Sequence, residues 1–208
     1  MTDITVHDLE AYRRTRRLSL AAFFALALAV LVFGQSRSAP ETPLHEALEM
    51  AGIFLIVIGI VGRLWSKLYL EGRSSQPVVT DGPYSISRNP LYFFSAVAAI
   101  GIGAQMGAIA SAIGLGFACA LAFHAVILRE EKVLLSKLGA PYREYLTKAP
   151  RFVPNLSLYR EDGAIGFRPA NLLTTLLDGL AFLVAMPLVE LVDVLKQTGT
   201  LPVLFRLP

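Results

Sequence analysis

The sequence contains little cysteine, histidine or charge. Cys119 is the only cysteine among the 208 residues, which excludes an intramolecular disulfide and a zinc site built from cysteines. The histidines His7, His45 and His124 are too scattered along the chain to suggest a cluster of metal ligands. Charged residues make up 17% of the chain, whereas an average soluble protein carries about 25%. We therefore expect neither a metal site nor a disulfide-stabilised domain.

Apolar residues are abundant instead. They account for 54% of the chain, and the mean hydropathy is +0.56, which is too much apolar surface for a disordered chain. The formal net charge is +3, but the lysines and arginines do not gather on one face, so we expect no nucleic-acid partner. This composition predicts an integral membrane protein.

Five apolar segments are candidates for membrane-spanning helices, since a helix needs about 20 residues to cross a bilayer. These segments are 18–33, 47–61, 91–104, 108–128 and 172–192. The first follows four arginines and also resembles an export signal, but the later apolar segments favour a retained signal-anchor helix. The last contains Asp178, Pro187 and Glu190, so it either spans the membrane, which we favour, or lies in the interface. The predicted fold class is all-α, an integral membrane helical bundle of about five transmembrane helices.

A tight helical hairpin is predicted from the two central segments, because only Gln105-Met106-Gly107 separates them. Small residues let membrane helices approach closely. The glycines that would do so here are Gly101, Gly103, Gly107, Gly114 and Gly116. A dinucleotide-binding fingerprint is the alternative for these glycines, but it requires a preceding strand, and the surroundings are apolar.

The lysines and arginines orient the bundle, because short cytoplasmic loops carry an excess of positive charge. With the N-terminus inside, all but three of the 19 lysines and arginines lie on the cytoplasmic side, in the N-terminal tail and in 63–90 and 129–171. The outer side then holds Arg37, Lys196 and Arg206. We predict a multi-pass protein of the bacterial inner membrane with a cytoplasmic N-terminus.

The stretch 78–94, VVTDGPYSISRNPLYFF, has the first features suited to chemistry. Asp81-Gly82-Pro83 is typical of a turn, and Pro90 fits the first turn of a helix. Taken alone, the stretch has a simpler interpretation, with Arg88 as a positive flank and Tyr92 as an interfacial aromatic residue.

The stretch 129–155 has the second set of such features. Glu130 and Glu131 lie where a helix would leave the apolar layer, and Gly139 is suited to end that helix. An isolated acidic pair can also be a solvated helix end.

Together the two stretches form a distinctive order of short motifs. Gly-Pro-Tyr and Arg-Asn-Pro-x-Tyr precede the hairpin, and Glu-Glu-x-x-Leu, Leu-Gly-x-x-Tyr-x-x-Tyr and Pro-x-x-x-Pro follow it. This order resembles the isoprenylcysteine carboxyl methyltransferase family and its phospholipid N-methyltransferase relatives, which are integral membrane enzymes that use S-adenosyl-L-methionine. The resemblance covers residues 69–155, which form a methyltransferase core with a helical hairpin and a cytoplasmic cofactor-binding region. Two N-terminal membrane helices (1–68) precede this core, and a C-terminal extension with a fifth membrane or interfacial helix (156–208) follows it.

The resemblance and the chemistry of the cofactor imply which residues contact it. These are Val78, Val79, Tyr84, Arg88, Asn89, Pro90, Tyr92, Glu130 and Glu131, with Tyr69 and Gln76 further upstream. Glu130 would accept hydrogen bonds from the cofactor ammonium, and Arg88 or the N-terminus of the following helix would meet its carboxylate. Tyr84 and Tyr92 would pack on the adenine or face the sulfonium. Glu131, about 100° further round the helix, would pair with a base or orient Glu130.

Two positions depart from the pattern of the eukaryotic enzymes. Asn89 stands where those enzymes carry histidine, so an imidazole base is excluded there, and we name no catalytic base. Val126 stands where they place an arginine that contacts the substrate carboxylate, which leaves His124 and Arg129 as nearby candidates for substrate binding.

The implied function is methyl transfer to a lipid-like or prenylated acceptor that approaches from the bilayer, with O-methylation of a carboxylate favoured. N-methylation of a phospholipid or a small amine is the alternative within enzymes. A membrane scaffold or transport-like protein that keeps the fold without the chemistry is the alternative outside enzymes. The sequence does not indicate an oligomeric state.

Overall fold

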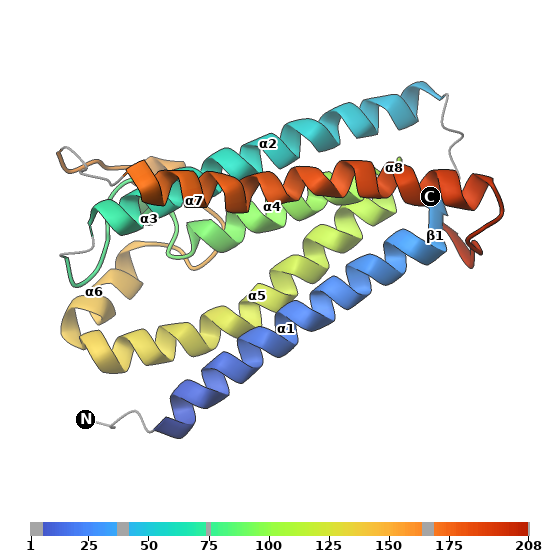
Figure 1. Ribbon diagram of the computed structural model, residues 1–208. Coiled ribbons are helices and arrows are strands. Elements are labelled where there is room, and N and C mark those ends of the chain that lie inside the picture. Colours follow the sequence, from blue (N-terminus) through green and yellow to red (C-terminus); the bar gives the residue numbers. More distant parts are fainter. Residues whose placement is uncertain (1–5, 37–41, 74–75, 164–168, 208) are drawn as a thin grey trace.

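A computed structural model of the chain describes residues 6–36, 42–73, 76–163 and 169–207 (Figure 1). The fold is mostly helical. Its elements are α1 (Val6–Phe33), β1 (Gly34–Ser36), α2 (Pro43–Gly72), α3 (Pro83–Ile86), α4 (Pro90–Ala104), α5 (Ile109–Leu138), α6 (Ala140–Lys148), η1 (Leu156–Leu158), α7 (Pro169–Leu180), η2 (Ala181–Val184), α8 (Ala185–Gln197) and β2 (Phe205–Leu207). The mostly helical structure agrees with the predicted all-α class, and the paired strands β1 and β2 are short exceptions to it. Strands of three residues are too short to show an alternating pattern in the sequence.

Four of the five predicted spans fall on separate helices, namely α1, α2, α4 and α5. Helices α2 and α5 are long and apolar enough to cross a membrane, whereas Arg17–Phe33 and α4 are shorter apolar helices. The count of five spans therefore stays a prediction.

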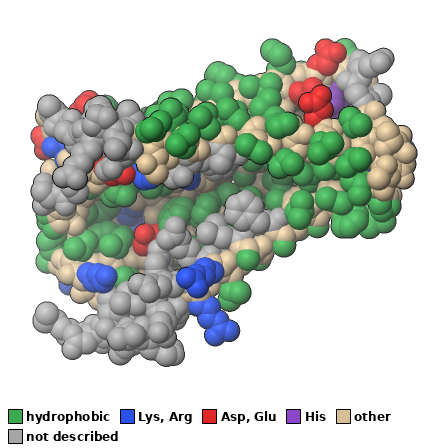
Figure 2. Space-filling model, viewed as in Figure 1, with side chains coloured by type: hydrophobic (Ala, Val, Ile, Leu, Met, Phe, Trp, Pro, Cys, Tyr) green, Lys and Arg blue, Asp and Glu red, His purple; other side chains and the backbone are tan. Residues whose placement is uncertain are grey.

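Large apolar side chains on the outer faces of the helices are exposed, as they would be toward lipid. They follow one face of each helix, as Met50, Ile53, Phe54, Val57 and Val61 on α2, and as Ile109, Ile113, Phe117 and Leu121 on α5. Figure 2 shows apolar side chains over most of the visible face, with lysines and arginines toward the end where α3 and α6 lie. Soluble monomers rarely expose apolar patches of more than a few hundred Å², so this surface supports association with a membrane.

Helices α2 and α4 pack backbone to backbone through glycines. A Cβ atom built on Gly52 would lie 2.7 Å from the Gly101 carbonyl oxygen, and one built on Gly101 would lie 2.6 Å from the Gly52 carbonyl oxygen. Gly101 therefore packs against α2, which corrects its predicted place in the hairpin of α4 and α5. Which neighbour a glycine faces depends on the rotation of the helix, and the glycine spacing alone does not give it.

The predicted hairpin of α4 and α5 forms, with residues 105–107 as its turn. Gly103 and Gly116 lie where a side chain would collide with the partner helix, and Gly107 adopts a φ of +64° in the turn. Gly114 is exposed and has nothing within 4 Å of a built Cβ atom, so its predicted place in the interface is wrong. It lies on the outer face of α5 beside Ile113.

The predicted fifth span is a broken helix, because η2 separates α7 from α8. Pro187 lies in the first turn of α8, a place that suits proline, whereas in an unbroken helix its ring would crowd the carbonyl four residues earlier. Beyond this break, the Lys196 amine donates to the carbonyls of Leu31 at 2.7 Å and of Gly34 at 2.5 Å, which joins α8 to the end of α1. Helices α7 and α8 together run along the bundle from one end toward the other (Figure 1). The fifth span therefore stays a prediction.

The two ends of the bundle carry different parts of the chain. The start of α1 lies at the same end as α3 and α6, whereas β1 and the C-terminus lie at the other end (Figure 1). We call the first of these the α3–α6 end. The segments predicted to be cytoplasmic thus gather at one end of the bundle.

Candidate functional site

The first predicted stretch forms a sharp turn at the α3–α6 end. Gly82 has a φ of +55°, and a Cβ atom there would collide with the Tyr69 ring, so glycine is required. Pro83 begins α3, and Pro90 begins α4 after the N-cap residue Asn89, as predicted for Pro90. Proline suits both places because the first N–H of a helix has no acceptor within that helix.

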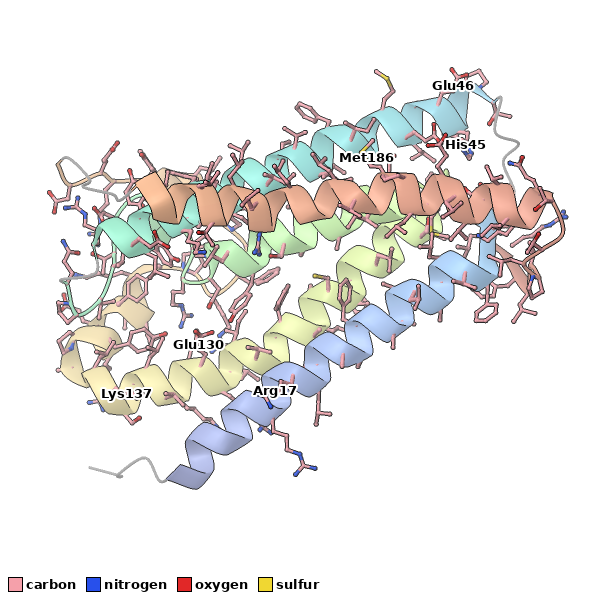
Figure 3. All side chains as sticks on the ribbon, in the orientation of Figure 1. Arg17, His45, Glu46, Glu130, Lys137 and Met186 are labelled. Atoms are coloured by element: carbon pink, nitrogen blue, oxygen red, sulfur yellow. The ribbon has the colours of Figure 1, made fainter. Side chains whose placement is uncertain are left out.

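Tyr92 and Glu130 meet at this end of the bundle. The Tyr92 hydroxyl donates a 2.8 Å hydrogen bond to Glu130 Oε2, and the Tyr92 ring stacks on Phe123 with the ring centroids 4.6 Å apart. Phe123 and Glu130 are seven residues apart on α5, so they lie on one face of that helix. Figure 3 shows Glu130 pointing from α5 toward α4. The stacked rings and the hydrogen bond together fix the direction of the carboxylate.

Glu131 is held between two arginines, a cluster that we call the Glu131 clamp. Arg88 Nη1 lies 2.8 Å from Glu131 Oε1, and Arg151 Nη2 lies 3.0 Å from Oε2. Arg151 Nε also donates to Oε2 at 3.1 Å and to Oε1 at 3.3 Å. The side chains of Arg88 and Glu131 are 12% and 10% exposed. Glu131 is therefore not a solvated helix end, and its predicted pairing with a base is confirmed.

One donor of the clamp lacks an acceptor. Arg88 Nε is buried and makes no hydrogen bond within the described part of the chain. A buried donor left without a partner costs about 1–3 kcal/mol. An acceptor oxygen placed against this atom would remove that cost, so Arg88 Nε is a candidate ligand contact.

A seam of hydrogen bonds joins residues 86–89 to residues 150–155. Arg88 N donates to Pro150 O at 2.8 Å, Asn89 Nδ2 to Arg151 O at 2.9 Å, Ser87 Oγ to Phe152 O at 3.0 Å and Asn155 N to Ile86 O at 2.9 Å. The seam lays the segment after α6 along the turn before α4. This path brings Arg151 to Glu131.

Helix α6 packs beside the same turn. Tyr142 and Tyr145 are buried in a cluster that also holds Val78, and the Tyr145 hydroxyl donates to the Tyr84 carbonyl oxygen at 2.7 Å. Burial, reinforced by the negative charge of Glu131, raises the pKa of Tyr142 to about 12. Tyr142 is therefore neutral at physiological pH and contributes no charge to the site.

The predicted cofactor residues divide into two groups. Those that come together around the clamp and the Tyr92–Glu130 pair are Arg88, Asn89, Pro90, Tyr92, Glu130 and Glu131. Val78 packs against α6, and Val79 is half-buried in the loop before α3. The Tyr84 carbonyl oxygen accepts from Tyr145 on α6. Burial, reinforced by the negative charge of Glu130, raises the pKa of the Tyr84 hydroxyl, so this side chain lies within reach of the Glu130 carboxylate. Of the two residues further upstream, Tyr69 donates to Glu161 and Gln76 is exposed.

The structure places the candidates for substrate binding, His124 and Arg129, on exposed faces of α5. It brings two further residues, Arg151 and Phe123, into the site, and the sequence analysis misses both. The seven-residue spacing from Phe123 to Glu130 is a helical signal that could have found Phe123. The position of Arg151 beside Glu131 depends on a reversal of the chain after α6, and no local sequence pattern indicates that reversal.

A cavity of about 230 Å³ lies between α6 and the loop before α3. It is lined by Thr80, Ser85, Tyr145, Lys148, Ala149, Leu158 and Arg160. None of the predicted cofactor residues lines it, so this cavity is distinct from the Tyr92–Glu130 pair.

Comparison with known proteins finds one matching family model and two similar relatives. A family model for phospholipid methyltransferases matches residues 48–140. The nickel-cobalt-cadmium resistance protein NccN of Alcaligenes xylosoxydans xylosoxydans is 35% identical over 184 residues, which are 88% of this chain and 85% of the relative. This chain belongs to the phospholipid methyltransferase family. The cobalt-zinc-cadmium resistance protein CzcN of Cupriavidus metallidurans is 36% identical over 176 residues, 84% of this chain and 80% of the relative.

The phospholipid methyltransferase match confirms the resemblance that the motifs predicted. No solved structure gives a significant match. The matched residues include the Tyr92–Glu130 pair and Glu131 and end before Arg151. Among the side chains that the structure describes, no group of three His, Cys, Asp or Glu is placed to hold a metal ion.

Proposed function

We propose that this protein is a membrane-embedded S-adenosyl-L-methionine-dependent methyltransferase that acts on a lipid-like acceptor. Membership of the phospholipid methyltransferase family supports methyl transfer in a membrane. The observation that carries the proposal is the pairing of Glu130 with Tyr92 beside the Glu131 clamp. Two arginines engage one carboxylate of the acidic pair, while the other carboxylate faces α4 and accepts a hydrogen bond from Tyr92.

The charges of this site fit the two ends of the amino-acid portion of the cofactor. Glu130 suits the ammonium, because a charge-assisted hydrogen bond is about twice as strong as a neutral one. Arg88 Nε, buried and without an acceptor among the described residues, suits the carboxylate. The Tyr92 ring lies next to Glu130, and an aromatic face attracts a cation such as the sulfonium. Val78, Val79, Tyr84, Asn89 and Pro90 complete the proposed set of contacts.

The chain itself needs to supply little beyond binding and alignment. Bound S-adenosyl-L-methionine supplies a methyl group that its positively charged sulfur already activates. The residues of the site would hold donor and acceptor in line and exclude water. Asn89 does not titrate near neutral pH, and no catalytic base is proposed.

The acceptor we favour is a lipid-like carboxylic acid. Its carboxylate is already ionised near neutral pH and needs no base, whereas an ammonium acceptor must first lose a proton. The acceptor would reach the site from the bilayer, between the apolar helices. N-methylation of a phospholipid or a small amine is the alternative within the same fold.

The orientation we propose places the α3–α6 end in the cytoplasm of a bacterial cell, with the chain crossing the inner membrane several times. The excess of lysine and arginine in 63–90 and 129–171 supports this orientation. A cofactor made in the cytoplasm then reaches Glu130 without crossing the membrane.

The names of the two relatives favour a second candidate function. Both are named as metal resistance proteins, so this chain would serve resistance to metal ions. In that case it would keep the family fold as a scaffold or transport-like protein without methyl transfer.

Labelling of a bacterial membrane extract with methyl-labelled S-adenosyl-L-methionine separates the two functions. Wild-type protein should transfer label to one lipid species, and Glu130→Gln should not. Glu144→Gln is the matched control, because Glu144 is exposed on α6 and pairs with Lys148. Failure of the wild type to label any component of the extract would contradict methyl transfer and favour the second function.

A further inference from the structure

The segment after α6 supplies one side chain to the site, and that segment lies beyond the residues that the family model matches. We propose that Arg151 is a positioning residue. Its guanidinium holds Glu131 so that Arg88 Nε stays available to the methyl donor and Glu130 keeps its direction. This inference rests on the proposed function.

The two arginines engage Glu131 differently. Arg151 reaches both carboxylate oxygens through Nε and Nη2, whereas Arg88 reaches one oxygen through Nη1. Arginine pairs most strongly with a carboxylate when two of its nitrogens donate in parallel. Without Arg151, Arg88 would be free to turn Nε onto Glu131. Arg151 therefore keeps Arg88 engaged by a single nitrogen.

The balance of charge gives Arg151 a second effect. Glu130 and Glu131 are adjacent, and the two arginines of the clamp match the two carboxylates in number. Loss of Arg151 would leave Arg88 facing two carboxylates. Glu130 would then compete with Glu131 for Arg88 and would lose its direction toward α4.

The side chain of Arg151 can be tested apart from its main chain. The Arg151 carbonyl oxygen accepts from Asn89 in the seam, and a substitution of the side chain keeps that hydrogen bond. The side chain is also 41% exposed, so its truncation opens no closed cavity. Arg151→Ala therefore removes one of the two arginines of the clamp and leaves the seam.

Calorimetric titration of the full-length protein in detergent with S-adenosylhomocysteine gives the main readout. We expect Arg151→Ala to raise Kd about 10-fold. Arg151→Lys should behave similarly, because one ammonium does not hold both oxygens in a fork. Arg143→Ala removes the same charge from an exposed position on α6 and should change Kd by less than about twofold.

A double substitution distinguishes positioning from a general structural role. In a Glu131→Gln background the clamp is already broken, so Arg151→Ala should add less than about a twofold change in Kd. An equal effect in both backgrounds would overturn the positioning role. If Arg151→Ala does not stay folded, Arg151→Lys takes its place in both backgrounds.

The outcomes separate this inference from the proposed function. Binding by the wild type together with unchanged binding by both Arg151 variants would overturn the inference alone. Absence of binding by the folded wild type would overturn the proposed function and the inference with it.

Discussion

The Tyr92 hydroxyl donates a 2.8 Å hydrogen bond to Glu130 Oε2, and this bond joins the first turn of α4 to the C-terminal half of α5. The two residues are 38 positions apart, and the membrane hairpin lies between them. Because the Tyr92 ring also stacks on Phe123, this tyrosine combines an apolar contact with a polar one. The Tyr92 side chain therefore contributes both to the packing of α4 on α5 and to the direction of the Glu130 carboxylate.

Substitution of Tyr92 separates these two contributions. Tyr92→Phe keeps the stack on Phe123 and loses one hydrogen bond, which is worth about 1–2 kcal/mol, so Kd for S-adenosylhomocysteine should rise about 10-fold. Tyr92→Ala also loses an aromatic pair worth about 0.5–1.5 kcal/mol and should bind more weakly still. Calorimetry on both variants checks this order. Equal losses would show that the hydroxyl alone carries the role of Tyr92.

The two acidic residues should differ in their effect on stability. Glu131→Gln leaves Arg88 buried without its counterion and should lower the free energy of unfolding by about 3 kcal/mol. Glu144→Gln, which breaks an exposed pair with Lys148, should change the free energy of unfolding little, because solvent screens an exposed ion pair. Unfolding of both variants in detergent tests the difference. Similar losses for the two would mean that the clamp does not stabilise this end of the bundle.

Glycine substitutions test the packing of α2 on α4. Gly101→Ala places a Cβ atom 2.6 Å from the Gly52 carbonyl oxygen, and such overpacking should cost about 1–3 kcal/mol. Gly114→Ala meets nothing within 4 Å and should be neutral or stabilising by up to about 1 kcal/mol, because alanine favours helix. Thermal unfolding of the two variants is the measurement. A Gly114→Ala variant less stable than Gly101→Ala would contradict the arrangement of the helices.

The orientation in the membrane can be tested with single cysteines in a Cys119→Ala background. Thr147 lies on α6 and Glu46 near the start of α2, and both are exposed. An impermeant maleimide should label Glu46→Cys in intact spheroplasts and Thr147→Cys only after permeabilisation. The reverse pattern would place the candidate site outside the cytoplasm.

Local signals predicted much of the fold. Pro90 begins α4, and the turn at 105–107 ends it. Gly139, with a φ of +62°, ends α5 and donates to the Leu135 carbonyl oxygen. Each of these features depends on a few neighbouring residues, and proline and glycine have strong conformational preferences there. The sequence could therefore give the bounds of α4 and the end of α5, whereas the starts of α1 and α2 and the break between α7 and α8 were not predicted.

Features that depend on distant contacts were beyond the sequence. Gly101 faces α2 because of how α4 is rotated, and helical spacing does not set that rotation. Arg151 reaches Glu131, 20 positions earlier, because the seam folds the chain back. The motifs did bring Arg88, Tyr92 and Glu130 together, since the resemblance covers all three. Their contact with a cofactor stays a prediction.

The central claim is that Glu130 binds the ammonium group of the cofactor. Calorimetric titration of the wild type and Glu130→Gln with S-adenosylhomocysteine tests it most directly. The wild type should bind, and Glu130→Gln should bind about 30- to 150-fold more weakly, because the loss of a charge-assisted hydrogen bond costs about 2–3 kcal/mol. Glu130→Gln should unfold at the same temperature as the wild type, since Glu130 lies outside the clamp. Equal binding by the two proteins would contradict a cofactor site at Glu130.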